Sequence, residues 1–237
     1  MTEPFHREVV SFTRRGGRLT ERRQKAWDES ADFYVVEPPR TNSDTSVDPA
    51  YRFDPEAVFG RRAPLVLDIG TGRGESLVHA AKKHPDHDFL GLEVYVPGVA
   101  QTLVSARHED VTNIRLMVVD AVPALTTMLA PRSVAEVRLF FPDPWQKSRH
   151  HKRRIVNAEF AALVARVLEP GGVWRLATDW EHYAEQMHEV LTQTPHFDFS
   201  GDWSERFEDR PLTRFEQRGI AEGRTIRDLT ARLRLQP

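Results

Sequence analysis

Short apolar runs alternate along the middle of the chain with longer segments that predict helices. The runs occupy residues 65–69, 89–94, 114–119, 134–141 and 173–177. Each run is too brief for a helix, and its length is typical of a strand buried on both faces of a sheet. Helices are expected at residues 75–84, 99–107, 121–129, 157–168 and 181–191. This alternation predicts a doubly wound α/β fold, with a mostly parallel sheet and helices on both of its faces.

The two ends of the chain differ from this core. Residues 1–60 lack sustained periodicity, and we expect an N-terminal basic arm and linker there, followed by one domain over residues 61–237. The basic cluster of the arm consists of Arg14, Arg15, Arg18, Arg22, Arg23 and Lys25. Such a cluster either contacts phosphates or is a solvated tail, and both interpretations remain open. A short helical turn is expected at residues 54–60, and aromatic residues beyond residue 195 predict one or two last strands.

Composition narrows the class of protein without identifying it. Hydrophobic residues make up 40% of the 237 residues and charged residues 29%, which is typical of a globular domain. The chain contains no cysteine, which excludes disulfides, thiolate metal ligands and cysteine nucleophiles, and no metal site is predicted. No apolar run approaches the roughly 20 residues that span a bilayer, and the amino terminus lacks a signal-peptide pattern. We therefore expect a cytoplasmic protein with no membrane partner.

Glycines follow the first predicted strand in the pattern Asp68-x-Gly70-x-Gly72-x-Gly74. Glycine lets a backbone approach a ligand closely, and the start of the next helix offers unpaired N–H groups. The pattern alone also fits a tight turn in any α/β protein. Glu93 favours a binding role, because it ends the second strand 19 residues after Gly74, where an acid can accept hydrogen bonds from ribose hydroxyls.

The same region disfavours a dinucleotide as the cofactor. The spacing is G-x-G-x-G rather than the G-x-G-x-x-G of a pyrophosphate-binding turn. Asp120 ends the third strand and adds an acid suited to an exocyclic amine or a ring N–H. Together with Asp68 and Asp143 it makes this edge acidic, which repels phosphates and attracts a cation. S-adenosylmethionine is a nucleoside with a sulfonium cation and no phosphate, so we hypothesise that this half of the sheet binds it.

A rigid acidic loop and a basic segment follow the fourth predicted strand. Pro142 and Pro144 end the strand and stiffen the backbone around Asp143. Residues 147–154 then contain five Lys or Arg and two His. A charge run of this kind is usually a solvated face, but its position beside the cofactor edge favours phosphate contacts with a polyanion. Trp145 either stacks on a base or belongs to the core.

Three motifs in this half carry a resemblance to a known family. They are Phe-Phe-Pro-Asp-Pro-Trp-x-Lys-x-Arg-His-x-Lys-Arg-Arg at residues 140–154, Ala-Thr-Asp-Trp at 177–180 and Thr-Arg-Phe-Glu-Gln-Arg-Gly at 213–219. With them the chain closely resembles the bacterial tRNA (guanine-N7-)-methyltransferase family over residues 60–230. The resemblance implies the seven-stranded, Rossmann-like sheet of class I methyltransferases, whose last strand is antiparallel. It also implies methyl transfer from S-adenosylmethionine to N7 of a guanosine in the variable loop of tRNA.

The resemblance further implies roles for individual residues. The cofactor contacts are expected at Asp68, Gly70, Gly72, Glu93, Asp120 and Asp143. Asp143 also matches the residue to which the family's catalysis is attributed. Substrate contacts are expected at Lys147, Asp179, Thr213, Arg214, Phe215 and Glu216, and RNA contacts at Arg149, His150, His151, Lys152, Arg153 and Arg154. Arg214 stands where the family often has Lys, so a planar fork replaces a point charge there.

Two other classes of function stay open at this point. A methyltransferase for a small molecule would have no use for the basic segment and would not need tRNA. An RNA-binding protein without catalysis would lack the intact acid set, whereas all four acids are present here. The sequence leaves open whether the chain is a monomer or a homodimer, and which tRNAs it modifies.

Overall fold

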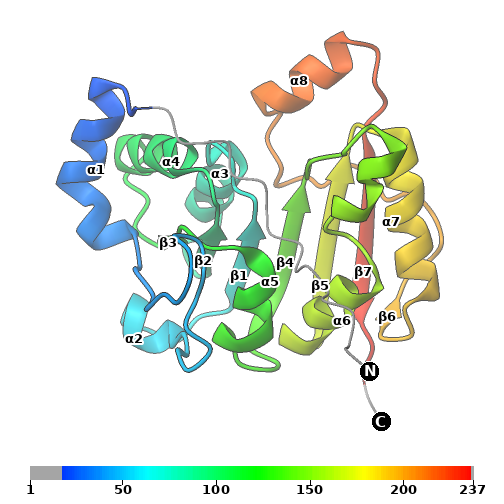
Figure 1. Ribbon diagram of the computed structural model, residues 1–237, viewed down its shortest axis with the longest axis horizontal. Helices are drawn as coiled ribbons and strands as arrows, with labels where there is room; N and C mark the ends of the chain where they lie inside the picture. Colours follow the sequence, from blue (N-terminus) through cyan, green and yellow to red (C-terminus); the bar gives the residue numbers. More distant parts are fainter. Residues whose placement is uncertain (1–17, 236–237) are drawn as a thin grey trace, which may run out of the picture.

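Seven strands form one sheet in the computed structural model, which describes residues 18–235 (Figure 1). In chain order they are β1 (Leu65–Ile69), β2 (Asp88–Leu92), β3 (Ile114–Met117), β4 (Val134–Phe140), β5 (Leu168–Thr178), β6 (Phe197–Asp198) and β7 (Arg227–Leu233). Their order in space is β3-β2-β1-β4-β5-β7-β6. Strands β1 to β5 are parallel, and β7 is antiparallel to both of its neighbours. The mostly parallel sheet with an antiparallel last strand is therefore confirmed.

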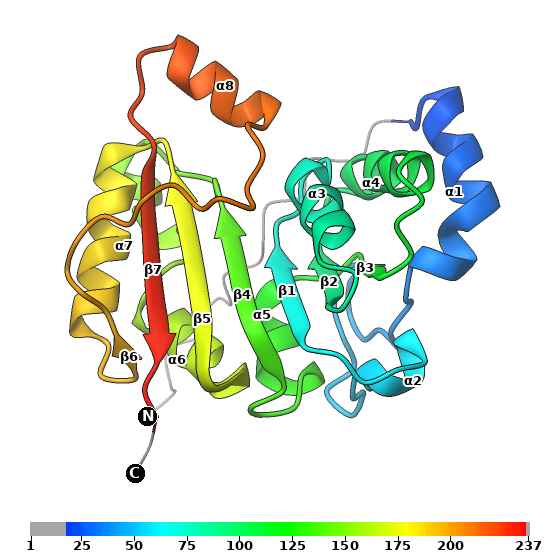
Figure 2. The same ribbon diagram turned by 180° about the vertical axis from the view of Figure 1, so that it is seen from behind.

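Helices cover both faces of the sheet, as the doubly wound pattern predicts. They are α1 (Glu21–Tyr34), α2 (Pro55–Phe59), α3 (Glu75–Lys83), α4 (Val96–His108), α5 (Ala121–Pro123), α6 (Ala158–Val167), α7 (Glu181–Gln193) and α8 (Arg214–Ala221). Helices α5, α6 and α7 lie on one face, and α3 and α4 lie on the other (Figures 1 and 2). Across residues 18–235, no helix has the length and apolar character of a membrane span.

Two buried apolar clusters hold these layers together, one on each face of the sheet. Leu67 and Val66 are neighbours in β1 but belong to different clusters, because successive side chains of a strand point to opposite faces. The first cluster joins Leu67 to Trp174 of β5 and Phe160 of α6. The second joins Val66 to Leu77 of α3. Each fully buried side chain of this size stabilises the fold by about 1.5–3 kcal/mol.

The segment before β1 contains more structure than the sequence predicts. Helix α1 buries Ala26, Ser30 and Tyr34, which are spaced four residues apart and therefore share one helix face. The hydroxyl of Tyr34 donates a hydrogen bond to the carbonyl oxygen of Val111 at 2.8 Å, which fastens α1 beside α4. This packing differs from the arm and linker expected there. Of the predicted basic cluster, Arg14 and Arg15 lie outside the described residues.

An extended segment, residues 199–213, runs from β6 back across the sheet to α8 (Figure 2). The ring of Phe207 lies under the guanidinium of Arg175, with the carbon of that group 4.0 Å from the ring centroid. Arg210 makes two hydrogen bonds to Asp228 of β7, at 2.6 and 3.0 Å. The segment therefore anchors α8 above the ends of β4 and β5, where Figures 1 and 2 both place it.

Candidate active site

The ends of four parallel strands bring the predicted acids to one edge of the sheet, which we call the carboxyl edge. Asp68 lies in β1, whereas Glu93, Asp120 and Asp143 follow β2, β3 and β4. Strand β1 pairs in parallel with both β2 and β4, so their carboxyl ends coincide. Asp143 therefore lies at the same edge as the glycine loop, residues 70–74, as the sequence hypothesis requires.

Glu93 ties the glycine loop to the end of β2. Its Oε2 accepts a hydrogen bond from the N–H of Gly72 at 2.6 Å, and its Oε1 accepts from the N–H groups of Val94 and Tyr95 at 2.8 and 2.9 Å. Burial raises the pKa of Glu93, the three N–H groups oppose the rise, and the charge of Asp143 adds to it. The carboxylate is thus held in place, and Oε2 keeps a lone pair for a further donor.

Asp68 is buried in β1, and its Oδ2 has no hydrogen-bond partner within residues 18–235. Burial raises the pKa of Asp68 to about 7; Arg138 opposes the rise, and Glu136 and Glu93 add to it. A buried carboxyl oxygen without a partner is costly, which indicates a position meant for a bound donor or cation. S-adenosylmethionine has hydroxyl and amine donors and a positively charged sulfonium, and acidic side chains can bind all of these. The residues present therefore fit this cofactor.

Asp120 starts α5 and also holds a loop at the carboxyl edge. Its side chain accepts a hydrogen bond from the N–H of Val122 at 3.0 Å, which caps the helix. Its own N–H donates to the carbonyl oxygen of Thr45 at 2.9 Å. The loop between α1 and α2, which contains Thr45, therefore reaches the predicted cofactor site.

Gly98, in the first turn of α4, is a site residue that sequence reasoning missed. A Cβ at this position would lie 2.2 Å from the carbonyl oxygen of Gly72. Helix α4 can therefore rest against the glycine loop only because residue 98 has no side chain. A glycine at the start of a helix is too common to signal this contact, which appears only when the two segments are seen together.

Gly98→Ala is expected to weaken binding of S-adenosylmethionine by about 5- to 150-fold, since overpacking at such a contact costs about 1–3 kcal/mol. In a free helix the same change would stabilise by about 1 kcal/mol, so the expected effect has the opposite sign. Calorimetric titration with the cofactor measures it. Ser105→Ala on the same helix is the matched control, because its hydroxyl bonds only to Gln101 of that helix. Unchanged affinity in Gly98→Ala would disprove the contact's role.

The loop that carries Asp143 has a strained backbone. Phe141 and Trp145, which flank Pro142-Asp143-Pro144, have φ angles of +53° and +45°. Side chains other than glycine rarely adopt this region, and such strain clusters at functional sites. The N–H of Phe141 donates to the carbonyl oxygen of Ala177 at 2.7 Å, which ties the loop to β5. Asp143 itself is exposed at the carboxyl edge.

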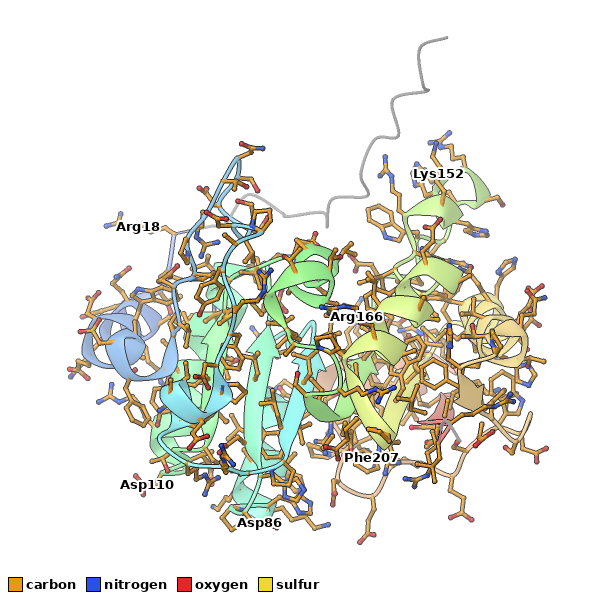
Figure 3. All side chains as sticks on the ribbon, turned by 90° about the horizontal axis from the view of Figure 1, so that it is seen from below. Arg18, Asp86, Asp110, Lys152, Arg166 and Phe207 are labelled. Atoms are coloured by element: carbon orange, nitrogen blue, oxygen red, sulfur yellow. The ribbon has the colours of Figure 1, made fainter. Side chains whose placement is uncertain are left out.

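The basic segment forms a 3-10 helix over Ser148–Arg153, directly after the Asp143 loop. Its side chains at Lys147, Arg149, Lys152 and Arg153 are exposed, and those of His150 and His151 are half-buried. Lys152 lies at the periphery of the molecule (Figure 3). The guanidinium carbon of Arg153 lies 4.9 Å from the centroid of the half-buried Trp145 ring. An exposed cationic surface therefore adjoins the carboxyl edge.

Arg154 differs from the rest of this segment, because it is only 1% exposed. Its Nε donates to the carbonyl oxygen of Pro144 at 2.8 Å, and its Nη1 donates to Gln186 Oε1 of α7 at 2.8 Å. The guanidinium is thus bonded inward through Nε and Nη1, whereas no hydrogen bond reaches its Nη2 within residues 18–235. The RNA contact of Arg154 stays a prediction. In this structure Arg154 holds the Asp143 loop against α7.

Helix α8 brings residues from late in the chain to the same edge. Thr213 caps it by accepting the N–H of Glu216 at 3.2 Å. The N–H of Arg214 donates to Glu75 at the start of α3, at 2.9 Å. Phe215 is half exposed, and its ring centroid lies 5.4 Å from that of Phe141. The start of α8 thus lies beside both the start of α3, which follows the glycine loop, and the Asp143 loop.

Glu216 is a buried acid of helix α8. It is 1% exposed, and it accepts hydrogen bonds from Arg206 at 3.0 and 3.1 Å and from Arg210 at 3.2 Å. Its carboxylate is therefore bonded to two arginines in this structure, and the substrate contact of Glu216 stays a prediction. Its role in this structure is to fasten α8 to residues 199–213.

Asp179 directly follows β5 and is nearly buried. Its Oδ2 accepts a hydrogen bond from Arg224 Nε at 2.7 Å. Through β5, which pairs with β4, it belongs to the same carboxyl edge as Asp143. Of the predicted contacts beyond the cofactor acids, Asp179 and the start of α8, residues 213–215, therefore lie at this edge, and Lys147 follows the Asp143 loop in the chain. Their contacts with the substrate stay predictions.

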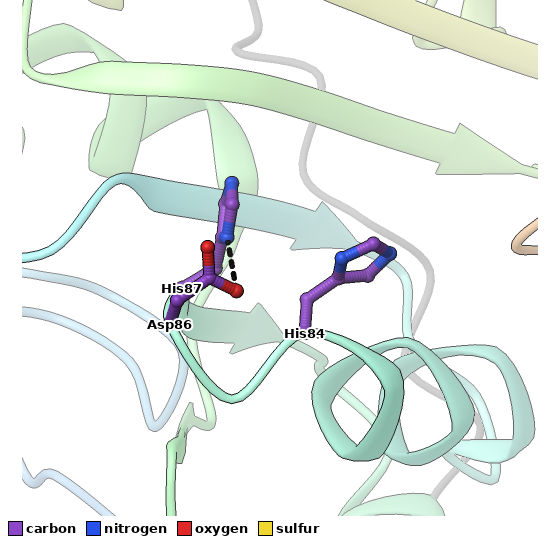
Figure 4. A group of neighbouring side chains, drawn as sticks. All are labelled: His84, Asp86 and His87. Carbon is purple, nitrogen blue, oxygen red and sulfur yellow. Dashed lines mark ion pairs between the residues drawn. The ribbon is translucent and has the colours of Figure 1, made fainter.

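Within residues 18–235 one group of side chains could hold a metal ion: His84, Asp86 and His87, whose ligand atoms lie within 4.8 Å of one another (Figure 4). His87 Nδ1 lies 3.1 Å from Asp86 Oδ1, and His84 Nε2 lies 2.8 Å from Asp209 Oδ2. These residues precede β2, whereas Glu93 follows it. The group is therefore at the opposite edge of the sheet and takes no part in the site.

Comparison with known proteins agrees with this geometry. A family model described as "Putative methyltransferase" matches residues 62–229. Among solved structures, the 16S rRNA methyltransferase KamB is similar in fold, with a TM-score of 0.57, 16% sequence identity, and coverage of 76% of this chain and 92% of that one. At this identity the likeness shows the fold alone, which is the Rossmann-like class I methyltransferase fold.

Several curated relatives are much closer in sequence, and each is named tRNA (guanine-N(7)-)-methyltransferase. The relative from Paenarthrobacter aurescens is 48% identical over 89% of this chain and 70% of its own length. The relative from Cutibacterium acnes is 46% identical over 95% of this chain and 83% of its own length. The relative from Pseudomonas putida is 43% identical over 94% of this chain and 90% of its own length. The chain therefore belongs to the bacterial tRNA (guanine-N7-)-methyltransferase family.

Proposed function

We propose that this protein transfers the methyl group of S-adenosylmethionine to N7 of a guanosine in the variable loop of tRNA. One observation carries the proposal: a single sheet edge holds the acid set that fits the cofactor and adjoins the exposed basic segment. Asp143 lies between the two, on a loop that Arg154 holds in place. The family's named substrate, tRNA, supports the choice of a polyanion.

The cofactor would be held by Asp68, Glu93, Asp120 and the glycine loop. Glu93 suits the ribose hydroxyls, because its carboxylate is already fixed by backbone N–H groups. Asp120 suits the adenine amine, and Asp68 together with Asp143 supplies negative charge for the sulfonium. The bound cofactor supplies an electrophilic methyl group, which the chain's residues must align with the base.

The chemistry needs no obligatory general base. N7 of guanine has a free lone pair and no proton, so it can attack the methyl carbon directly. Catalysis is then mainly in-line positioning, with stabilisation of the positive charge that develops on the purine. Asp143 and Asp179 can serve both purposes, because each carboxylate can accept hydrogen bonds from N1–H and N2–H₂ and favours a cationic ring.

Removing basic side chains should weaken tRNA binding without affecting the cofactor. We expect Lys147→Ala and Arg153→Ala each to flatten the plot of log affinity against log salt by about one unit of slope for each phosphate that is no longer neutralised. Filter binding of tRNA between low and moderate salt measures this, with calorimetry for the cofactor. Lys82→Ala is the matched control, because this exposed lysine lies at the end of α3, on the opposite edge, and pairs with Glu109. A salt slope unchanged in both site variants would contradict the assignment.

Two alternative functions make different predictions. A small-molecule methyltransferase would transfer label without tRNA, and an RNA-binding protein would transfer none. Incubation with labelled S-adenosylmethionine and bulk tRNA, followed by digestion to nucleosides, should yield labelled 7-methylguanosine. A tRNA whose variable-loop guanosine is replaced by adenosine should stay unlabelled, and label in that tRNA would reject the variable-loop assignment.

Because its substrate is tRNA, we propose that the protein acts in the cytoplasm.

A further inference from the structure

An arginine beyond helix α8 holds the carboxylate of Asp179. Arg224 Nε donates to Asp179 Oδ2 at 2.7 Å. The side chain of Asp179 is 8% exposed and that of Arg224 is 27% exposed, so most of the pair is shielded from water. A charge-assisted hydrogen bond of this length fixes the direction of a carboxylate as well as its position.

The backbone of α8 also packs against Asp179, from a different side than Arg224. Gly219 is buried against Asp179, and a Cβ on it would lie 2.9 Å from Oδ2 and 3.3 Å from the Asp179 Cβ. The N–H of Arg224 donates to the carbonyl oxygen of Gly219 at 2.9 Å. The turn after the helix therefore brings the arginine back toward the acid, and helix and arginine together enclose one face of Asp179.

Only one of the two carboxylate oxygens is engaged by this arrangement. Oδ2 is bound to Arg224, and no hydrogen bond from the described part of the chain reaches Oδ1. The strand that ends at Thr178 is tied to the Asp143 loop through the bond from Phe141 N–H to Ala177 O. Asp179 is thus an acid of fixed orientation beside the loop that carries Asp143, with one acceptor oxygen left over.

We propose that Arg224 is a positioning residue, which holds Asp179 so that Oδ1 accepts hydrogen bonds from the target guanine, and that Gly219 is required for this contact. The proposal rests on the proposed function, in which Asp179 orients the base. Guanine offers N1–H and N2–H₂ on its Watson–Crick edge, and these donors match a carboxylate acceptor. Arg224 itself does not touch the base, because its guanidinium faces Asp179 and Glu222.

The test is a double-mutant cycle of Arg224→Gln with Asp179→Asn. We expect Arg224→Gln to lower kcat by about 10- to 100-fold, with KM for tRNA and affinity for S-adenosylmethionine changed less than about threefold, since misorientation acts on the transition state. In the Asp179→Asn background the same substitution should cost nothing further, because Arg224 acts through that acid. Arg224→Lys should recover part of the missing kcat, since it restores a cationic donor.

Arg218→Gln is the matched control. Arg218 lies on α8, is 78% exposed and pairs with Glu222 as Arg224 does, but it makes no contact with Asp179. We expect wild-type kinetics from it. A wild-type kcat in Arg224→Gln, or an equal loss in the Asp179→Asn background, would overturn the positioning role. Absence of 7-methylguanosine from reactions with the wild-type protein would instead reject the proposed function itself.

Discussion

Replacing Asp143 with alanine is expected to lower kcat by about 10²- to 10³-fold, the usual cost of losing a group that orients or stabilises a transition state. The fold should survive, because Asp143 is exposed and its loop is held by other residues, among them Arg154. Affinity for S-adenosylmethionine should fall much less than kcat, because Asp68, Glu93 and Asp120 remain. Initial rates of methyl transfer to tRNA, with cofactor titration alongside, measure both quantities.

A second substitution and a control sharpen this result. Asp143→Asn keeps the size of the side chain and removes its charge, so a loss close to that of alanine would assign the effect to the carboxylate. Asp86→Ala removes an exposed acid at the opposite edge of the sheet and should leave kcat unchanged. Full activity in Asp143→Ala would remove this residue from the mechanism.

Asp68→Asn is expected to stabilise the fold and weaken cofactor binding at the same time. Burial raises the pKa of Asp68 from 3.8 to about 7. Keeping this carboxyl ionised in the folded cofactor-free protein therefore costs up to roughly 4 kcal/mol at pH 8, and asparagine removes that cost. Arg138 keeps its ion pair with Glu136 at 2.5 Å, so the variant leaves no isolated buried charge. Affinity for the cofactor should fall, because an acceptor with negative charge is removed.

The stability gain of Asp68→Asn should depend on pH with a definite sign. The pKa is higher in the folded state, so the wild-type protein loses stability as pH rises from the unfolded pKa of 3.8 to the folded value of about 7. The advantage of the variant should therefore be largest above pH 7 and shrink as pH falls toward 5. Urea unfolding of both proteins from pH 5 to 8 measures it. An advantage that grows toward acid pH would show that Asp68 is not the buried acid described here.

The carboxyl edge was predictable because it depends only on the strands being parallel. Any residue that follows a parallel strand lies at one edge of the sheet, so Glu93, Asp120 and Asp143 had to meet the glycine loop once the strands were identified. Only the family motif that begins at Thr213 suggested that the start of α8 belongs to the site. No periodic pattern in the sequence places it there. The direction of a strand does not determine where the side chains that follow it point.

That limit explains why the burial of two predicted site residues was not expected from the sequence. Arg154 and Glu216 stand in charged, motif-like surroundings that suggest exposure, and both are 1% exposed. Arg154 is bonded to the Asp143 loop, and Glu216 is bonded to Arg206 and Arg210. A buried ionic side chain is stable only with such partners, and these come from distant parts of the chain.

The charged face of β4 was hidden from sequence reasoning for a related reason. The run that includes Glu136 and Arg138 was interpreted as apolar, and Arg138 is indeed buried, at 2% exposure. Its guanidinium carbon lies 5.5 Å from the ring centroid of Phe89 and 5.0 Å from that of Phe207. Phe207 belongs to the segment that crosses the sheet before α8, and no local pattern predicts that crossing. Helix α1 was missed similarly, because its buried face holds only Ala26, Ser30 and Tyr34 among charged residues.

In the proposed function, one sheet edge holds both the methyl donor and the RNA. A structure of the protein with S-adenosylhomocysteine and tRNA bound tests it most directly. We expect the cofactor sulfur between the glycine loop and Asp143, with N7 of the target guanine facing it and the phosphates along Lys147, Lys152 and Arg153. Cofactor at the opposite edge, or tRNA on a face away from this basic segment, would contradict it.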